Sequence, residues 1–239
     1  MSRKIRTIFS DIEGTYERIN HLLTFGFDIL WRRRAVRLAV REGGGRWLDV
    51  CTGTGETAVY LQQRSGGSTR VTAVDFSPAM IGAAVAKPGA EGIDFVLADT
   101  GRLPFPDDSF DLVTLSFATR NLNTGSEALP AVFAEIARVV RPDGRYINLE
   151  TSQPRNALLR TFFHGYVALV VRRLGRWISG SDAAYAYLGS TIPRFHPPED
   201  LAAILTGAGF AQVEIRRLLG GVAAIHIARK APAGEGPHQ

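Results

Sequence analysis

The chain has 239 residues and a net charge of +5, with 45% apolar and 21% charged residues. This length suits one large α/β domain, and the composition excludes the disordered and fibrous classes. No uncharged apolar stretch reaches the roughly 18 residues of a spanning helix, and no apolar segment typical of a secretory signal follows the N-terminus. A single cysteine, Cys51, excludes an internal disulfide and fits a reducing cytosol.

Apolar residues at helical spacing open the chain. Phe9, Ile12, Tyr16 and Ile19 fall on one helix face, which predicts a helical cap over residues 1–42. Three glycines at 43–45 end the pattern, and the main domain is predicted over 43–230. A disordered tail is expected at 231–239.

From residue 46 on, apolar runs alternate with helical patterns. Strands are predicted at 46–50, 71–75, 93–98, 110–117, 146–150, 211–218 and 222–229, and helices after Ser77-Pro78, over 127–140 and over 198–209. Such alternation predicts an α/β fold, with a parallel sheet covered by helices on both faces. Residues about 155–192 interrupt it as a helical insertion that is apolar almost all round, which suits a core helix, a lid or a partner-facing surface.

The sequence Leu48-Asp49-Val50-Cys51-Thr52-Gly53-Thr54-Gly55 is a short strand that runs into a loop with two glycines. Glycine lets the backbone approach a ligand, and carboxylates at the tips of the next two strands, Asp75 and Asp99, can grip a nucleoside. Because ligands of parallel sheets bind beyond the carboxyl ends of the strands, these residues and Ser116 are expected to lie together. The arrangement predicts S-adenosylmethionine as the cofactor.

Each candidate has a distinct expected role. Gly53 and Gly55 let the loop pass the methionine part, while Thr54 supplies an N–H and a hydroxyl. Asp49 either orients the loop or meets the cofactor's amino group. Asp75 is the expected ribose ligand, and Asp99 with Thr100 either holds the adenine edge or caps a helix.

Several other chemistries lack their motifs. A phosphate loop of the Gly-x-x-x-x-Gly-Lys-Ser/Thr kind is missing, and the spacing Gly53-x-Gly55-x-x-Ala58 satisfies only the permissive nicotinamide fingerprint. Nucleic acid is not expected as a partner, because the chain has no Asn/Asp-Pro-Pro-Tyr/Phe element to grip a flipped base. No metal site is expected, because His and Cys residues are scattered.

Motifs along nearly the whole chain resemble the quinone-biosynthesis C-methyltransferase family, which acts on demethylmenaquinol and in ubiquinone synthesis. They are Tyr16, Asn20, Gly26, Asp28, Trp31 and Arg32; Leu103-Pro104-Phe105; Phe117-Ala118-Thr119-Arg120-Asn121-Leu122; Arg141-Pro142-Asp143-Gly144; Leu149-Glu150-Thr151-Ser152-Gln153-Pro154; Tyr185-Ala186-Tyr187-Leu188; and Gly220-Gly221-Val222-Ala223 with His226. Glu17, Ala118-Thr119 and Asp143 depart from the family pattern.

The resemblance implies a Rossmann-like class I methyltransferase with a mostly parallel seven-stranded sheet. It implies cofactor binding through Thr54, Asp75, Asp99 with Thr100, and Ser116. The implied reaction methylates a ring carbon of a prenylated demethylquinol, with demethylmenaquinol favoured over a benzoquinol. For that reaction Arg120 would stabilise an oxyanion by charge and Asn121 by hydrogen bonding, while Tyr16 and His226 are candidates to relay the proton.

Alternatives remain open at this point. The chain could be another lipid or small-molecule methyltransferase, such as a phospholipid N-methyltransferase, or a non-catalytic scaffold that binds the cofactor. Two basic clusters, 32–41 and 172–176, adjoin apolar helices and suit either solvated helix faces or peripheral contact with a membrane. The insertion could equally serve a homodimer. The expected location is the cytoplasm, with the inner membrane face as the alternative.

Overall fold

The computed structural model describes residues 17, 20–171 and 189–234. Its sheet consists of β1 (Arg46–Val50), β2 (Arg70–Asp75), β3 (Ile93–Leu97), β4 (Phe110–Ser116), β5 (Val140–Thr151), β6 (Phe210–Leu218) and β7 (Ala223–Lys230). The strand order is β3-β2-β1-β4-β5-β7-β6, and only β7 runs antiparallel to its neighbours. The prediction of a mostly parallel seven-stranded sheet is therefore confirmed.

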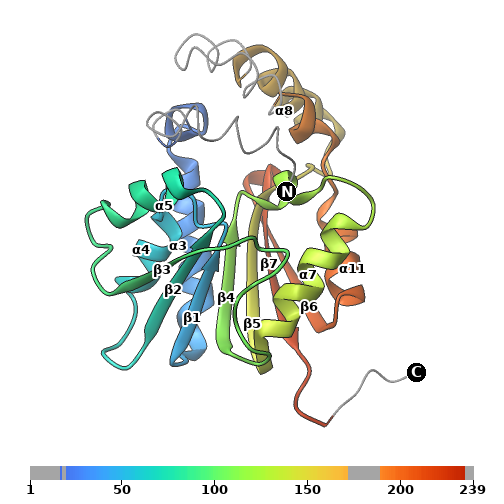
Figure 1. The fold of residues 1–239 in the computed structure, drawn as a ribbon. Coiled ribbons are helices and arrows are strands. Elements are labelled where there is room, and N and C mark those ends of the chain that lie inside the picture. The colour runs from blue at the N-terminus through green and yellow to red at the C-terminus, as the bar shows by residue number, and fades with distance from the viewer. Residues whose placement is uncertain (1–16, 18–19, 172–188, 235–239) are drawn as a thin grey trace.

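Helices cover both faces of the sheet (Figure 1). They are α3 (Phe27–Ala39), α4 (Glu56–Gln62), α5 (Pro78–Val85), α6 (Thr119–Leu122), α7 (Ala128–Val139), α8 (Ala157–Tyr166) and α11 (Pro198–Gly207), with short turns η1 (Val40–Glu42), η2 (Val167–Val171), η3 (Ile192–Arg194) and η4 (Leu219–Gly221). None of the helices in the described part of the chain has the length and apolarity to span a bilayer.

Alternate strand residues feed two separate apolar layers, as the period of a strand dictates. On one face Trp31 of α3 and Trp47 of β1 belong to the same buried cluster. On the other face Phe133 of α7, Tyr146 of β5 and Phe210 of β6 are fully buried together. The two layers fix the sheet, so the loops beyond its carboxyl ends have a rigid base.

The fifth strand begins earlier than the predicted 146–150. Val140 pairs with Phe110, and the next pair joins Arg145 to Leu112, so residues 141–144 bulge out of the ladder. Asp143 adopts a φ of 61° in that bulge. The predicted turn at residues 141–144 is therefore a bulge inside the long strand β5, and it does not precede the strand.

The helical insertion is only partly described. Its α8 contains no buried residue, so this helix is not a core helix. It lies across the end of the sheet where the strands' carboxyl ends meet (Figure 1). Residues 172–188, which include the second basic cluster, lie outside the described part, as do residues 1–16 of the predicted cap.

Candidate active site

Two cavities of different character meet at the carboxyl end of the sheet. A polar cavity is lined by Cys51, Thr52, Gly53, Thr54, Glu56, Asp75, Phe76, Met80, Ser116, Ala118, Asn121 and Leu122. An apolar cavity of about 360 Å³ is lined by Asn20, Leu23, Thr24, Phe25, Phe27, Asp28, Trp31, Arg120, Thr151, Leu159, Phe162, Phe163, Tyr166, Val167, Ile192, Leu219 and Val222. Arg32 and Phe117 line both, with the guanidinium carbon 4.9 Å from the ring centre. These two side chains form a common wall.

The loop after β1 bends tightly toward α5. Gly53 and Gly55 have φ values of 58° and 83°, and a Cβ at Gly55 would lie 3.0 Å from that of Ala84. The Asp75 carboxylate accepts hydrogen bonds from the backbone N–H groups of Gly53 and Ser77, each at 2.9 Å. Burial raises the pKa of Asp75, and these donors oppose that rise. Asp75 therefore joins the glycine loop to the start of α5 and lines the polar cavity.

Asp49 lies beneath the polar cavity and does not line it. Its two carboxylate oxygens accept hydrogen bonds from the hydroxyls of Thr114 and Thr52, both at 2.6 Å. Burial raises the pKa of this 1%-exposed group to about 6. Of the two roles considered for Asp49, the geometry favours orienting the loop.

Asp99 and Thr100 do not line the polar cavity either. The Asp99 carboxylate accepts a hydrogen bond from the N–H of Gly101 at 2.9 Å, while the Thr100 hydroxyl is 3.1 Å from the Cys51 sulfur. These contacts hold the turn after β3 against the loop after β1. The structure thus brings Gly53, Thr54, Asp75 and Ser116 together around one cavity and leaves Asp99 and Thr100 beside it.

Arg120 and Asn121 point into different cavities from the short helix α6. Arg120 lines the apolar cavity, whereas Asn121 lines the polar one. The guanidinium donates to Glu150 at 3.1 Å and to the Thr151 hydroxyl at 3.0 Å, and the Glu150 carboxylate also accepts from the Arg120 backbone N–H. The buried Arg120 Nε and Asn121 Oδ1 have no hydrogen-bond partner among the described residues. Each retains hydrogen-bonding capacity toward a ligand.

The two proposed proton relays are placed differently. Tyr16 lies outside the described residues. His226 is buried in β7, lines neither cavity, and its Nε2 is 2.9 Å from the carbonyl oxygen of Pro198. Burial lowers the pKa of His226. These contacts favour a structural role in holding the start of α11, and they do not favour a relay.

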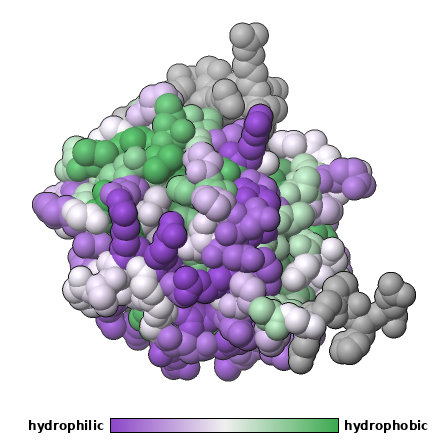
Figure 2. All heavy atoms as spheres, turned by 60° about the horizontal axis from the view of Figure 1, so that its bottom comes forward, coloured by the Kyte–Doolittle hydropathy of each residue, from purple (hydrophilic) through white to green (hydrophobic). Residues whose placement is uncertain are grey.

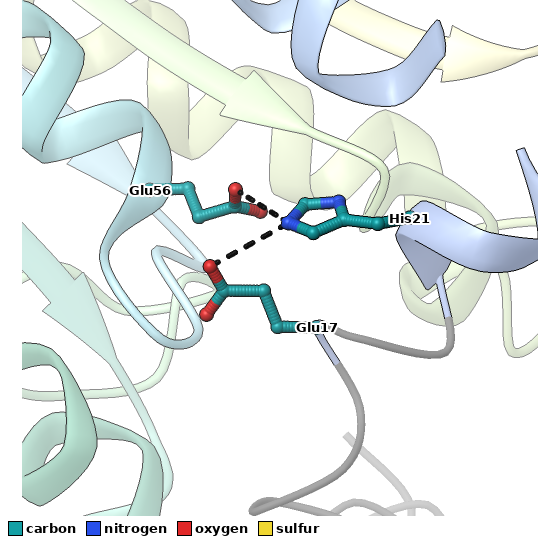
Figure 3. Close-up of side chains that lie close together, drawn as sticks. All are labelled: Glu17, His21 and Glu56. Carbon is teal, nitrogen blue, oxygen red and sulfur yellow. Dashed lines mark ion pairs between the residues drawn. The ribbon is translucent and has the colours of Figure 1, made fainter. Parts of the chain in front are cut away.

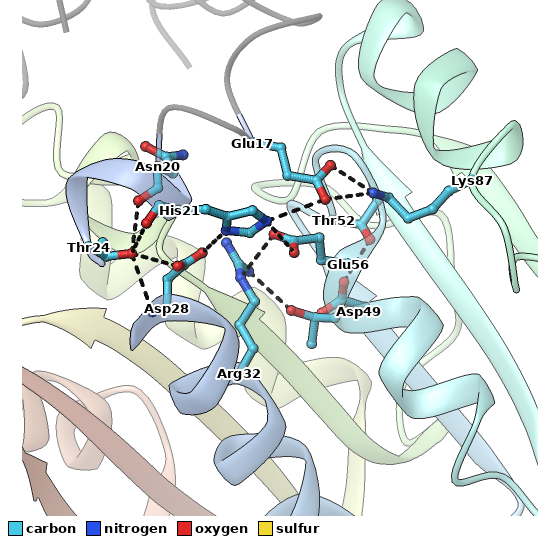
Figure 4. A network of polar contacts seen from close by, with 11 residues as sticks. Glu17, Asn20, His21, Thr24, Asp28, Arg32, Asp49, Thr52, Glu56 and Lys87 are labelled. Carbon is cyan, nitrogen blue, oxygen red and sulfur yellow. Dashed lines mark hydrogen bonds and ion pairs between the residues drawn. The ribbon is translucent and has the colours of Figure 1, made fainter. Parts of the chain in front are cut away.

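A polar network that sequence reasoning missed connects the two cavities (Figure 4). It joins Glu17, His21, Asp28, Arg32, Glu56 and Lys87. The sequence could have pointed to three of these residues: Asp28 and Arg32 belong to the N-terminal motif that resembles the family, and Glu56 directly follows the glycine loop. The nitrogen and carboxylate oxygens of Glu17, His21 and Glu56 lie within 4.8 Å of one another (Figure 3). Lys87 and Arg32 supply positive charge to the two carboxylates at 2.7 and 3.3 Å.

Comparison with known proteins identifies the relatives of this chain. The profile of the ubiE/COQ5 methyltransferase family matches residues 1–230. The chain belongs to this family. It is 41% identical over 222 residues to demethylmenaquinone methyltransferase of Thermus thermophilus, covering 92% of this chain and 98% of that one. It is 37% identical to the ubiquinone/menaquinone biosynthesis C-methyltransferase UbiE of Desulfotalea psychrophila, covering 93% and 88%.

Solved structures establish the fold of this family member. A possible histamine N-methyltransferase from Thermotoga maritima matches with a TM-score of 0.67 and 18% identity, over 94% of this chain and 99% of that one. Human N-acetylserotonin methyltransferase in complex with S-adenosylmethionine matches with a TM-score of 0.60 and 20% identity, over 90% and 57%. The chain is an S-adenosylmethionine-dependent methyltransferase with the Rossmann-like class I fold.

Proposed function

We propose that this enzyme methylates a ring carbon of a prenylated demethylquinol, with demethylmenaquinol as the favoured substrate. The observation that carries the proposal is the apolar cavity that shares Arg32 and Phe117 with the polar cavity. A flat aromatic ring with a hydrocarbon tail matches a cavity walled by aromatic and aliphatic side chains. Both relatives named above bear names from quinone biosynthesis.

The polar cavity has the chemistry that the cofactor needs. The positive φ of Gly53 lets the backbone pass close to a ligand, and Asp75 stands at the tip of β2 as a ribose acceptor. The unpartnered Asn121 oxygen offers a further acceptor in the same cavity. When bound there, S-adenosylmethionine supplies an electrophilic methyl group on a positively charged sulfur.

The apolar cavity must make a ring carbon nucleophilic. Ionisation of the neighbouring hydroxyl pushes electron density onto that carbon, so the enzyme must stabilise an oxyanion. Arginine stays protonated in proteins, and Arg120 keeps its Nε donor without a partner among the described residues. Glu150 holds the other edge of the guanidinium, so Arg120 is oriented before substrate arrives.

The open end of the apolar cavity suits a membrane surface. Among large apolar side chains exposed in the described chain, all but Val85 and Leu97 come from three segments around this cavity. We call the following set the apolar rim: Leu22, Phe25, Leu30, Leu158, Phe162, Leu169 and Leu219. Seen from the opposite end of the sheet, hydrophilic side chains dominate the lower and central surface (Figure 2). A prenyl tail could pass from a bilayer over this rim into the cavity.

The test of function is single-turnover methylation of demethylmenaquinol and of a demethyl benzoquinol, both with short prenyl tails. We expect methylated naphthoquinol as the main product. Arg120→Lys should lower the rate by about 100-fold or more, because lysine lacks the planar fork that Glu150 and the oxyanion share. Cofactor affinity should stay within about threefold, since Arg120 does not line the polar cavity.

The matched control is Arg64→Ala, an exposed arginine beyond the end of α4. Its rate should equal that of the unmodified enzyme. An unmodified enzyme that methylates neither quinol would remove the substrate proposal. A normal rate for Arg120→Lys would remove only the oxyanion role.

A further inference from the structure

We propose that Asp28 is the catalytic base that takes the proton from the quinol hydroxyl, and that His21 carries this proton to the surface. The inference rests on the proposed function and names the proton acceptor for that reaction. It follows from the position of one buried carboxylate in the apolar cavity and from the chain of polar groups behind it (Figure 4).

Asp28 is a buried carboxylate in the wall of the apolar cavity. It lies in the first turn of α3, is 3% exposed, and lines the apolar cavity. Among the described residues that line this cavity it is the sole acid. A carboxylate in such a place requires hydrogen-bond partners, and Asp28 has two: the Thr24 hydroxyl at 2.5 Å and His21 Nδ1 at 2.7 Å. Each carboxylate oxygen keeps a lone pair for a third donor.

His21 connects Asp28 with the outside. Its side chain is 25% exposed, and its Nε2 lies 3.4 Å from a Glu56 oxygen and 3.6 Å from a Glu17 oxygen. Asp28 and these glutamates therefore occupy opposite nitrogens of one imidazole, the arrangement that a proton relay needs. Glu17 is itself 29% exposed, so a proton that reaches it can enter solvent.

Two of the three acids around His21 have a cation as partner before substrate binds. Lys87 pairs with Glu17 at 2.7 Å, and Arg32 pairs with Glu56 at 3.3 Å. Burial acts to raise the pKa of Glu17, but the hydrogen bond and the charge of Lys87 outweigh burial, so the pKa of Glu17 is lowered. For Glu56, burial raises the pKa against the opposing charge of Arg32. Among the described residues, the charged groups around the imidazole are Glu17, Asp28, Glu56, Arg32 and Lys87.

The other candidates for the base fit less well. An arginine side chain is a poor base, because the guanidinium does not give up its proton in proteins, and this argues against Arg120. The Tyr166 hydroxyl lines the cavity but donates to the carbonyl oxygen of Leu23 at 2.6 Å, and burial raises its pKa. His226 lines neither cavity. Of the described residues that line the cavity, Asp28 alone carries a carboxylate that can accept a proton.

The reaction balances with Asp28 as acceptor. The O–H bond of the quinol breaks, its proton passes to the Asp28 carboxylate, and the electron pair stays on oxygen. The ring carbon then forms its bond to the methyl carbon while the sulfur–methyl bond breaks and the sulfur keeps that electron pair. The same ring carbon then loses its proton; the electron pair of that C–H bond restores aromaticity and the negative charge on the quinol oxygen, and this oxygen takes up a proton again. One proton leaves per turnover, and the negative charge moves from Asp28 to the ring without changing the charge of the cavity.

The decisive experiment is single-turnover methylation of short-tailed demethylmenaquinol by Asp28→Asn across a range of pH. A general base typically contributes 100- to 10,000-fold, so we expect the rate to fall by about 100-fold or more. In a plot of the methylation rate against pH, the rise that accompanies ionisation of the base (the pH limb) should disappear in this variant. Cofactor affinity should change by less than about threefold, because Asp28 does not line the polar cavity.

The matched control is Asp107→Asn, a 74%-exposed carboxyl in the loop that precedes β4, and its rate and pH profile should be unchanged. A merely structural Asp28 would alter thermal stability or substrate affinity and leave the pH limb intact. A second arm uses quinols with electron-withdrawing ring substituents. Their more acidic hydroxyls should reduce the defect of Asp28→Asn, since less help is needed to ionise them.

If Asp28→Asn does not fold, His21→Gln decides the question. Glutamine can still hydrogen-bond to Asp28 but cannot pass a proton, so the rate should fall by about tenfold or more with a displaced pH limb. If Asp28→Asn folds, or else if His21→Gln is used in its place, a rate that depends on pH as in the unmodified enzyme overturns the role of Asp28. That outcome differs from failure of the proposed function, in which the unmodified enzyme would methylate no quinol at all.

Discussion

At the residue scale, three buried acids differ in the partners that replace the lost hydration of their carboxylates: Asp28, Asp49 and Glu150. Among the described residues, Glu150 has an ion pair with Arg120, Asp28 has an imidazole and a hydroxyl, and Asp49 has two threonine hydroxyls, with the charge of Arg32 acting on it without an ion pair. Uncharged donors compensate an ionised carboxylate least well. Asp49 is consequently the acid whose ionisation should weigh most on folding.

Asp49→Asn tests that expectation through the pH dependence of stability. In the folded chain the pKa of Asp49 rises from 3.8 to about 6, so ionisation costs about 3 kcal/mol more than in the unfolded chain. The folded state then holds the proton more tightly, and this carboxyl lowers stability as pH rises from about 4 to about 6. The unfolding free energy of the variant minus that of the unmodified enzyme should grow by about 3 kcal/mol over this interval. Urea denaturation without cofactor measures it, and a constant difference would contradict the buried ionisation.

At the scale of elements, the junction between β1 and α4 depends on one left-handed residue. Gly55→Ala would force a side chain into a φ of 83° and place its Cβ 3.0 Å from that of Ala84. The backbone cost is about 1–2 kcal/mol before any clash, so the melting temperature should fall and cofactor affinity should drop about tenfold as the loop shifts. Calorimetry of the variant measures both effects.

The matched control for Gly55→Ala is Gly66→Ala, where a Cβ would meet nothing within 4 Å. This second glycine lies in the loop before β2, at the other end of the sheet. Its replacement should leave cofactor affinity unchanged. Equal effects of the two substitutions would mean that the left-handed turn at Gly55 does not shape the cofactor cavity.

The same scale explains how much the sequence could predict. The strands and the glycine loop were predictable because alternation and turn chemistry are local. The position of Asp75 was predictable because strand ends of a parallel sheet meet. The contact of His21 with Glu56 was not, since it depends on how the chain before α3 folds back over α4. For the same reason Asn121 was assigned to the substrate, although α6 turns it into the polar cavity.

At the scale of the whole molecule, the apolar rim makes one end of the enzyme unlike the other. Leu22 and Leu158 are 52% and 67% exposed on separate segments of this rim and line neither cavity. Replacing both with serine should reduce binding to vesicles of anionic phospholipid by about tenfold or more, because two large side chains no longer enter the lipid. Flotation of vesicles with the enzyme measures this, and methylation of a tailless quinol should change little.

Val85→Ser is the control for the rim, because this 57%-exposed residue lies on α5 and lines neither cavity. Its vesicle binding should equal that of the unmodified enzyme. If neither protein floats with vesicles and the unmodified enzyme sediments as a dimer, the rim is a protein interface and the membrane proposal fails.

The wall formed by Arg32 and Phe117 has a thermodynamic consequence. Phe117 holds a φ of 58° at the end of β4, a conformation that a bulky residue adopts only under constraint from its neighbours. A ligand in either cavity that shifts Phe117 changes the wall of the other cavity, so such a shift would link the two binding equilibria. Linkage is reciprocal: if the quinol tightens binding of the methyl donor by some factor, the donor tightens binding of the quinol by the same factor.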